Sequence, residues 1–299
     1  MHKQPALPPL NHNVEFPKPG ATAPTSVTEE KVSDVSYDFL QREFSEVFDI
    51  QNYRKPSLHD AVHHIVMKGP PVHCHVRRLS PECLMILRKE IQRLIDLDVI
   101  EPSRSSWASP VHLVPKSDPG QFRITGDYRL LNNQTEPDRY LLPFLHDFAG
   151  NLHGARIFSN LDLYKGYHQI RIAKEDAPKT AIITPIGSFQ FRRMPMGLSS
   201  SAQTFQRFLD EVLRGLTFAF WYVDDILIFS KGVTDHKEHL RQVFSRLRCY
   251  GLILNKNKCE FGVPEIRFLG HVICNKGMRP IPAKVEAIHR FSLPSSIYR

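Results

Sequence analysis

Two adjacent acids, Asp224 and Asp225, interrupt a segment of strand-forming apolar residues that runs from Phe218 to Phe229. Aromatic and β-branched residues on both sides favour strands and aspartate favours a turn, so the pattern predicts a hairpin with the carboxylates at its tip. Two carboxylates held that close repel each other, and a divalent cation between them would offset the repulsion. The segment therefore indicates a metal site. A solvent-exposed Asp-Asp turn is the alternative, because so short a motif also occurs by chance.

A third acid, Asp162, stands between Leu161 and Leu163 at the end of a predicted strand, where an ordinary surface acid is not expected. If this strand lies beside the acidic hairpin, three carboxylates can surround two divalent ions about 3.5–4 Å apart, as in-line phosphoryl transfer requires. One ion would lower the pKa of an attacking hydroxyl, and the other would hold a leaving pyrophosphate. Taken alone, Asp162 is explained equally well as the cap of a helix or turn.

Helices and antiparallel strands alternate along the chain and must position these acids. Ser80 followed by Pro81 is typical of a helix start, and the apolar period predicts a helix that ends near Leu97. Gly251 is expected to cap a later helix at its C-terminal end. These elements indicate an α+β fold. The other predicted elements are helices at 37–48, 202–213 and 236–250, a strand pair at 107–115 and 122–128 joined by a turn at 116–120, strands at 157–163 and 169–172, and a hairpin at 182–191.

Composition narrows the class of protein. With 299 residues and 41% hydrophobic content the chain can build one or two cores, which excludes a fibrous protein. The formal charge of +8 fits a surface that faces nucleic acid, although solubility alone also explains it. The five cysteines lack a disulfide or zinc-site spacing, so we expect reduced thiols in an intracellular, cytoplasmic protein. No apolar run is long enough to span a membrane, and we expect no membrane partner.

A series of short motifs follows one another between Val62 and Pro294. They are Arg77–Glu82, Ser106–Pro110, Gly126–Asn132, Leu161–Leu163, Gly166–Ile170, Pro178–Ala181, Gln203–Gln206, Tyr222–Asp225 and Phe268–His271. In this order they are similar to the reverse transcriptase of Ty3/gypsy-type retrotransposons. Each motif alone is weak, but the ordered series is specific and makes the solvent-exposed turn a minor alternative.

The resemblance implies an α+β right-hand polymerase with fingers, an antiparallel-sheet palm and a largely missing thumb. We expect a disordered linker at 1–36, a segment at 37–75 that connects protease and polymerase, fingers at 76–155, a palm at 156–275 and the start of a truncated thumb at 276–299. The chain lacks the Asp-Thr-Gly or Asp-Ser-Gly triplet of an aspartic protease. We therefore expect it to be a fragment of a longer polyprotein.

The resemblance also implies the roles of the acids. Asp162, Asp224 and Asp225 would be the catalytic metal ligands, helped by the backbone carbonyl of Leu163. The expected cofactors are two divalent ions, Mg²⁺ or Mn²⁺.

Four side chains match the family's nucleotide pocket: Lys116, Arg123, Tyr167 and Met196. The lysine and the arginine would grip the incoming triphosphate, where cations neutralise the charge of the leaving pyrophosphate. Tyr167 resembles the aromatic gate that occupies the space of a ribose 2′-hydroxyl. Met196 replaces the family's usual phenylalanine, and we expect altered kinetics with metal binding retained. Without the resemblance, a turn lysine, a strand-edge arginine and a core tyrosine would explain the first three.

A further set of residues is expected to contact primer or template. A solvated helix face explains the two on the predicted helix at 202–213 nearly as well, and an ordinary buried strand explains those that match the family's primer grip. The set comprises Gln203, Arg207, Tyr222, Phe268, Leu269 and Gly270.

The resulting hypothesis is an RNA-directed DNA polymerase of a replicating retrotransposon. Its partners would be an RNA template, a DNA or RNA primer, deoxynucleoside triphosphates and the RNA–DNA duplex. A truncated, non-catalytic nucleic-acid-binding remnant is the alternative, because we expect the chain to be truncated at both ends and it carries a formal charge of +8. An RNA-dependent RNA polymerase shares the palm chemistry, but a gate at Tyr167 would exclude ribonucleotides.

Overall fold

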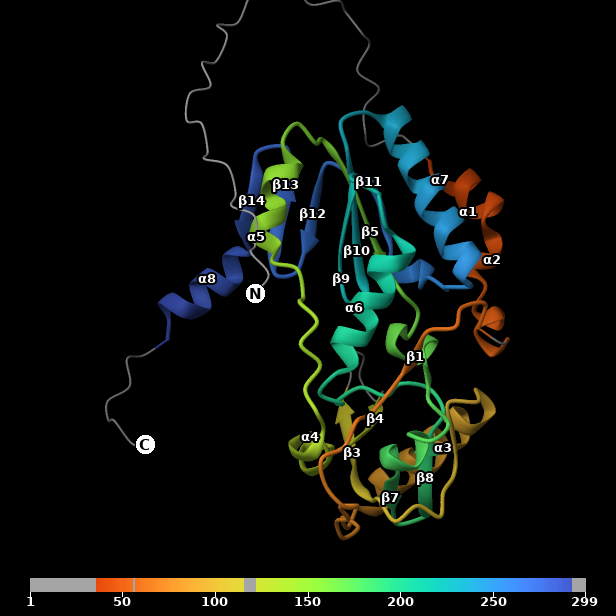
Figure 1. The fold of residues 1–299 in the computed structure, drawn as a ribbon. Helices are drawn as coiled ribbons and strands as arrows, with labels where there is room; N and C mark the ends of the chain where they lie inside the picture. The colour runs from red at the N-terminus through yellow and green to blue at the C-terminus, as the bar shows by residue number, and fades with distance from the viewer. Residues whose placement is uncertain (1–35, 56, 116–121, 292–299) are drawn as a thin grey trace, which may run out of the picture. The chain divides into compact units, whose positions relative to one another are not determined.

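The structure, a computed structural model, describes residues 36–55, 57–115 and 122–291. These residues form a mixture of helices and mainly antiparallel sheets, as the alternating pattern predicts (Figure 1). None of the described helices is both long and apolar enough to cross a membrane. The helices are α1 Asp38–Glu43, α2 Ser45–Phe48, α3 Pro81–Asp96, α4 Arg129–Gln134, α5 Leu145–Phe148, α6 Ser201–Val212, α7 Val233–Tyr250 and α8 Pro282–His289, with short 3-10 helices that include η4 Gly166–Gln169 and η6 Lys256–Lys258.

A four-stranded antiparallel sheet carries the acidic residues. Its strand order is β11-β5-β10-β9, with bounds Glu260–Val263, Ile157–Asp162, Asp225–Ser230 and Ala219–Tyr222. The predicted hairpin at 218–229 is confirmed as β9 and β10. Strand β10 is buried on both faces because Ile226 and Ile228 join one core cluster while Leu227 and Phe229 join another. This two-sided burial explains the nearly continuous apolar run in the sequence.

Helices α6 and α7 cover the face of the sheet that Ile226 and Ile228 line. Both helices bury the residues that their apolar period predicts, which are Phe205, Phe208, Leu209 and Val212 of α6 and Leu240, Val243, Phe244 and Leu247 of α7. Helix α7 begins at Val233, earlier than predicted, and ends as predicted where Gly251 takes a left-handed conformation.

A second, three-stranded sheet covers the opposite face. It contains β12 Glu265–Phe268, β13 His271–Cys274 and β14 Gly277–Pro280, and α5 lies beside it (Figure 1). The Phe268 ring meets the Phe220 ring edge-on at a centroid distance of 6.0 Å. Leu269 and Gly270 form the turn between β12 and β13 with φ values of 44° and 79°. Two of the three residues predicted to form a primer grip therefore sit at a hairpin turn, and the alternative of an ordinary buried strand is wrong for Leu269 and Gly270. Their role stays a prediction.

A five-stranded sheet forms the other part of the fold. Its strand order is β2-β8-β7-β3-β4, with bounds Ile100–Pro102, Gly187–Phe191, Ile182–Thr184, Ser109–Pro115 and Phe122–Gly126. The predicted strand pair is confirmed as β3 and β4, and the predicted hairpin as β7 and β8. The turn at 116–120 lies outside the described residues. Helix α3 begins as predicted, where the Ser80 hydroxyl accepts the N–H of Cys83, and it contacts β2 and β4.

The strand predicted at 169–172 is shorter in the structure. Only Arg171 and Ile172 form the strand β6, which pairs with β1 Val62–His63. Gln169 instead ends η4, where its buried side chain donates to the carbonyls of Tyr164 and Ile253 and accepts the N–H of Ile253. The periodicity could not reveal these tertiary hydrogen bonds.

The N-terminal described segment docks on α7 (Figure 1). The helix predicted at 37–48 is interrupted at Phe44, which separates α1 from α2. The rings of Phe44 and Phe48 meet the Phe244 ring edge-on at centroid distances of 5.7 and 5.4 Å. Glu43 forms an ion pair with Arg241 of α7. The sequence alone does not identify this partner, because the contacting residues are far apart in the chain.

A buried hydrogen-bond chain ties α7 to the two strands that carry acids. Ser159 of β5 and Ser230 of β10 lie 2.6 and 2.8 Å from the two ring nitrogens of His236. The N–H of Gly262 donates to the Ser159 hydroxyl. Burial lowers the pKa of His236 to about 3, so the imidazole is neutral at physiological pH. The neutral ring accepts at one nitrogen and donates at the other, which fits its position between two hydroxyls.

We predict that Gly262→Ala destabilises the fold. Gly262 has φ +61°, and a Cβ there would lie 2.1 Å from the Tyr37 ring. Tyr37 is buried, so the clash cannot be relieved without moving the segment that precedes α1. We expect a loss of about 2 kcal/mol or more in the free energy of unfolding, measured by urea denaturation. Gly215→Ala is the matched control, because Gly215 also has a positive φ, +84°, but a Cβ added there would meet nothing within 4 Å. Equal losses in both variants would contradict the clash.

Candidate active site

The sheet brings the three predicted carboxylates together at one end of its two central strands. Asp225 begins β10 and pairs directly with Asp162, the last residue of β5. Asp224 lies in the turn just before Asp225, and its carbonyl accepts the N–H of Leu163 at 3.4 Å. The predicted grouping of Asp162, Leu163, Asp224 and Asp225 is therefore present in the geometry, while their roles as metal ligands stay a prediction.

The turn between β9 and β10 is strained and is held by a side chain of α6. Tyr222 pairs with Asp225, which leaves Val223 and Asp224 as the two turn residues. Val223 has φ 55°, a conformation that β-branched residues rarely adopt. The Gln206 side-chain oxygen accepts the N–H of Val223 at 2.9 Å. The sequence did not predict this role for Gln206. Its place in the Gln203–Gln206 motif was the only sign that it matters.

Burial and mutual repulsion set the electrostatics of the acids. Burial, followed by the charges of Asp224 and Asp162, raises the pKa of Asp225 to about 6. Burial and the charge of Asp162 also raise the pKa of Asp224. Both carboxylates are thus destabilised as anions, and a bound cation would reverse the effect. Three carboxylates are hard oxygen donors of the kind that Mg²⁺ and Mn²⁺ prefer, so the residues fit such a cofactor.

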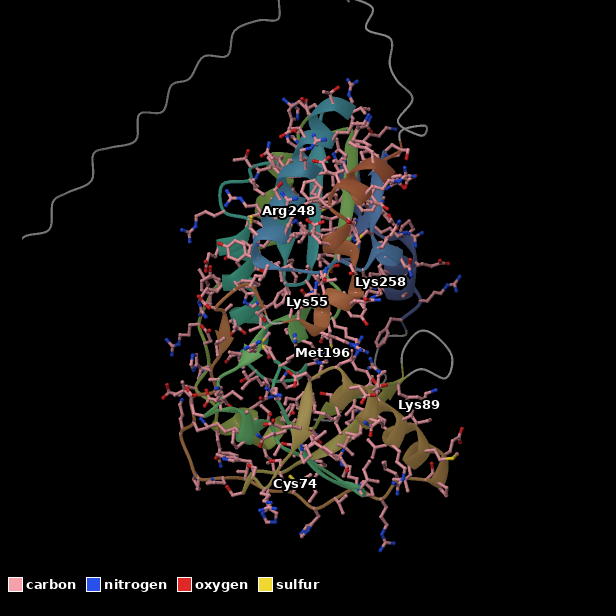
Figure 2. All side chains as sticks on the ribbon, turned by 90° about the vertical axis from the view of Figure 1, so that its right-hand side faces the viewer. Lys55, Cys74, Lys89, Met196, Arg248 and Lys258 are labelled. Atoms are coloured by element: carbon pink, nitrogen blue, oxygen red, sulfur yellow. The ribbon has the colours of Figure 1, made fainter. Side chains whose placement is uncertain are left out.

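A lysine that sequence analysis missed reaches this site. The Lys258 ammonium, from η6, lies 3.4 Å from Asp162 Oδ2. Its positive charge opposes the pKa rise of Asp224 and Asp225. The N–H of Asn255 donates to the Asp162 carbonyl at 2.8 Å, which fixes the chain just before η6. Figure 2 labels Lys258 and, below it in that view, Met196. No spacing rule in the sequence connects Lys258 to Asp162.

Another cluster, separate from the three aspartates, has side-chain ligand atoms close enough together to hold a metal ion. Among the described residues, His64, Glu175 and Asp176 form the group whose ligand atoms all lie within 4.8 Å of one another. Asp176 is already engaged, because Oδ1 lies 2.5 Å from the Lys179 ammonium and Oδ2 accepts the N–H of Ile65. This lysine already supplies the positive charge that a metal would bring. We therefore assign no metal site there.

Tyr167 lies against the turn that carries Asp224. Burial and the nearby charge of Asp224 raise the pKa of Tyr167 to about 12. The tyrosine ring packs on the Phe205 ring of α6 at a centroid distance of 5.5 Å. A Cβ on the preceding Gly166 would lie 2.9 Å from the Asp224 Cβ, so glycine allows the close approach. The structure thus places Tyr167 beside the acids, and its gate role stays a prediction.

Arg123 and Met196, both predicted to bind nucleotide, are in contact. A guanidinium nitrogen of Arg123 in β4 lies 3.1 Å from the Met196 sulfur. The Thr125 hydroxyl donates to the Met196 carbonyl, and the Asn132 amide donates to the carbonyl of Gly197. The loop that follows β8 is therefore fixed by β4 and α4. Lys116 lies outside the described residues.

The predicted primer and template residues lie in separate places. Tyr222 ends β9 opposite Asp225, while Phe268, Leu269 and Gly270 form the end of β12 and its turn.

On α6, the Arg207 guanidinium binds both carboxylate oxygens of Asp138 at 2.8 and 2.6 Å and stacks over the Tyr140 ring. The Gln203 side-chain oxygen is buried without a hydrogen-bond partner. A template contact by Arg207 would therefore compete with Asp138.

The family follows from a comparison with known proteins. The family model described as "Reverse transcriptase (RNA-dependent DNA polymerase)" matches residues 114–273, which is more than half of the chain. The chain belongs to the reverse transcriptase family. The matched range contains the three aspartates, Tyr167 and the Phe268–Gly270 turn, so the resemblance seen in the motifs is confirmed.

Curated relatives are polyproteins of gypsy-type retrotransposons. The Pol polyprotein from transposon 297 of Drosophila melanogaster is 38% identical over 215 residues, covering 70% of this chain and 20% of the relative. The one from transposon gypsy is 35% identical over 220 residues, covering 71% of this chain and 21% of the relative. The transposon Tf2-3 polyprotein of Schizosaccharomyces pombe is 33% identical over 220 residues, covering 73% of this chain and 16% of the relative. The chain thus spans about a fifth of these relatives.

Solved structures of similar fold are foamy viral protease-reverse transcriptases. The one in complex with RNA/DNA hybrid has a TM-score of 0.75 at 21% identity, covering 87% of this chain and 36% of that chain. The form in complex with double-stranded DNA has a TM-score of 0.73 at 22% identity, covering 92% of this chain and 51% of that chain. The fold is therefore that of a right-hand polymerase with fingers and an antiparallel-sheet palm. The boundaries between linker, connecting segment, fingers, palm and thumb stay predictions.

We predict that Asp225→Asn stabilises the metal-free protein at pH 7.5 and less so at pH 5. The folded-state pKa of Asp225 is about 6, above the ordinary value of 3.8, so ionisation destabilises the fold. Stability is therefore regained as the pH falls through 6 and the carboxyl becomes neutral. A gain of about 1 kcal/mol at pH 7.5 would raise Tm by about 2–4 °C.

The measurement is a thermal melt in the presence of a chelator at both pH values. Asp60→Asn, which removes an exposed carboxylate outside the sheet, controls for the loss of a charge. A Tm difference between Asp225→Asn and wild type that is the same at both pH values would contradict the raised pKa.

Proposed function

We propose that this chain carries the polymerase centre of an RNA-directed DNA polymerase that replicates a retrotransposon. The observation that supports the proposal is the register of β5 and β10, which pairs Asp162 with Asp225 beside Asp224. This grouping lies within the part of the chain that matches the reverse transcriptase family. Because the chain spans about a fifth of its curated relatives, the proposal concerns this part of such a polyprotein.

In this proposal the acids hold two divalent ions, Mg²⁺ or Mn²⁺. Asp162, Asp224 and Asp225 would be the side-chain ligands, and Leu163 would add its carbonyl. When bound, such ions lower the pKa of the primer 3′-hydroxyl and neutralise charge on the leaving pyrophosphate. The chain's own contribution is to hold the three carboxylates close together at one end of a rigid sheet. Lys258 adds an ion pair to Asp162.

The remaining groups would orient the substrates. Arg123 has a guanidinium within reach of the Met196 loop and would pair with the triphosphate of an incoming deoxynucleotide. Lys116 would act with it. Tyr167 would occupy the space beside the sugar and exclude a 2′-hydroxyl. The turn at Leu269 and Gly270 would support the primer end.

The proposed partners are an RNA template, a DNA or RNA primer and the resulting RNA–DNA duplex. The foamy viral structures of similar fold were obtained with RNA/DNA hybrid and with double-stranded DNA. A formal charge of +8 favours binding to such polyanions. These partners are proposed for this chain by analogy of fold and by charge.

We predict that the protein extends a primer on an RNA template with deoxynucleotides when Mg²⁺ or Mn²⁺ is present. Asp224→Asn should reduce the rate by at least about 10²-fold, because misplacing a reacting group already costs that much. Gel analysis of a labelled primer measures the extension. Asp60→Asn is the matched control and should extend like wild type. Equal rates for Asp224→Asn and wild type would refute the proposed role of the acids.

We also predict that Tyr167→Val relaxes the choice of sugar. The ratio of kcat/KM for a deoxynucleotide to that for the matching ribonucleotide should fall by at least about tenfold, because the smaller side chain leaves room for a 2′-hydroxyl. Single-nucleotide incorporation on the same primer and template gives both values. Tyr250→Val, at the end of α7, controls for loss of a tyrosine ring. An unchanged ratio for Tyr167→Val would contradict the gate role of Tyr167. It would also remove the argument against an RNA polymerase.

A further inference from the structure

The side chain of Gln206 connects α6 to the turn that carries Asp224. Gln206 is 1% exposed, and its oxygen accepts the N–H of Val223 at 2.9 Å. Its amide nitrogen donates to Asp210 Oδ1 at 2.9 Å and lies 3.5 Å from the Trp221 carbonyl. A backbone N–H can only donate and an ionised carboxylate can only accept. The two neighbours therefore independently require the same orientation of the Gln206 amide.

Asp210, one turn further along α6, anchors this amide. Besides Gln206, Asp210 Oδ1 accepts the Trp221 indole N–H at 2.6 Å, and Oδ2 accepts the Tyr140 hydroxyl. Three donors from three segments of the chain thus surround one carboxylate. Such a carboxylate has little freedom to rotate, and it transmits that rigidity to Gln206.

The turn needs such support because of its backbone conformation. Val223 has φ 55°, and a β-branched residue in this region is strained. Strained residues persist when their surroundings determine the conformation, and here the N–H of Val223 faces the Gln206 oxygen. The next residue along the chain is Asp224. A change in this turn would therefore move the Asp224 carboxylate relative to Asp162, which sits on a different strand.

A surface cavity lies next to the Gln206–Asp210 pair. It has a volume of about 550 Å³, and its lining includes Gln206, Asp210, Trp221, Leu141 and Phe144. Leu141 and Phe144 are largely exposed. The Gln206–Asp210 pair borders this cavity, and the hydrogen bonds to Val223 and Asp210 set the orientation of the Gln206 amide.

We propose that Gln206 is a positioning residue that fixes the Val223–Asp224 turn in the geometry required for metal binding, and that Asp210 holds Gln206 in place. The inference rests on the proposed function, which makes Asp224 a metal ligand. Gln206 does not itself contact the metal or the substrate. Its effect is to set the position of Asp224.

The first test measures metal binding without any reaction. Mn²⁺ is titrated into the protein and followed by electron paramagnetic resonance. Gln206→Leu keeps a branched side chain, one atom shorter, but removes the acceptor for the Val223 N–H. We expect Mn²⁺ affinity to fall by about tenfold or more, as for other residues that orient metal ligands.

Gln190→Leu is the matched control. The Gln190 amide also bonds at both ends, to Ser103 and Glu101, but in the five-stranded sheet. Both variants are melted to compare their loss of stability. Weaker Mn²⁺ binding confined to Gln206→Leu supports the proposal, and equal Mn²⁺ affinities in both variants and wild type overturn it.

A second variant separates positioning from folding. In Gln206→Glu the acceptor oxygen remains, but the donor toward Asp210 exists only when the new carboxyl is protonated. We expect the ratio of wild-type to variant Mn²⁺ affinity to approach one as the pH is lowered from 8 to 6. A purely structural defect would give a ratio that does not change with pH, and this result would overturn the proposal.

A double-mutant cycle tests the link to Asp210. If Asp210 acts through Gln206, Asp210→Asn should weaken Mn²⁺ binding in the wild-type background but add little to Gln206→Leu. Independent, additive losses would overturn that part of the proposal.

Primer extension by the same proteins distinguishes a failure of the proposed function from a failure of the positioning role of Gln206. If wild type does not extend a primer, the proposed function fails while the Mn²⁺ titrations still test the role of Gln206. If wild type extends the primer and Gln206→Leu both binds Mn²⁺ and extends at the wild-type level, the proposed function stands and the positioning role is overturned.

Discussion

Repulsion among three carboxylates is the constraint on which the rest of this structure depends. Asp162, Asp224 and Asp225 lie at one end of the two central strands, and partial burial raises the pKa of Asp224 and Asp225. Groups that repel each other stay together only if the backbone holding them cannot yield. The central position of β5 and β10 in the sheet supplies that rigidity, because each is paired on both sides and covered on both faces. The stability of the surrounding core thus offsets the cost of the site.

Buried polar side chains form hydrogen bonds between segments that the sheet alone does not hold in place. Gln169 bonds to the segment at Ile253, and His236 joins α7 to β5 and β10. Gln206 bonds to the turn before Asp224. In each case the buried side chain pairs with groups on other segments of the chain, so displacing these segments would leave buried polar groups unpaired. These contacts lie outside the motif positions that carry the acids, and they explain how a few charged residues reach a defined geometry.

Sequence patterns predicted the elements whose formation depends on local signals. The helices α3, α6 and α7 follow their apolar period, and α3 also has the capping serine at Ser80. The acidic hairpin was predicted because aspartates at a turn interrupt an apolar run. The break at Phe44, the turn at Leu269 and the short 3-10 helix that ends at Gln169 were not predicted. The segments at Phe44 and Gln169 contact residues distant in the chain, and a single sequence does not report such contacts. The turn at Leu269 is local, but it lies inside a segment that the pattern did not divide into two strands.

The sequence by itself determined the identity of the acids and, through the order of its motifs, the family. Motif residues are adjacent in the chain, so their spacing survives in the sequence. Only the tertiary structure decided that Asp162 faces Asp225 across a ladder, that Lys258 reaches Asp162 and that Gln206 holds Val223. The physical reason is that these relations depend on strand register and on the docking of α6 and η6, which the packing of the whole core sets.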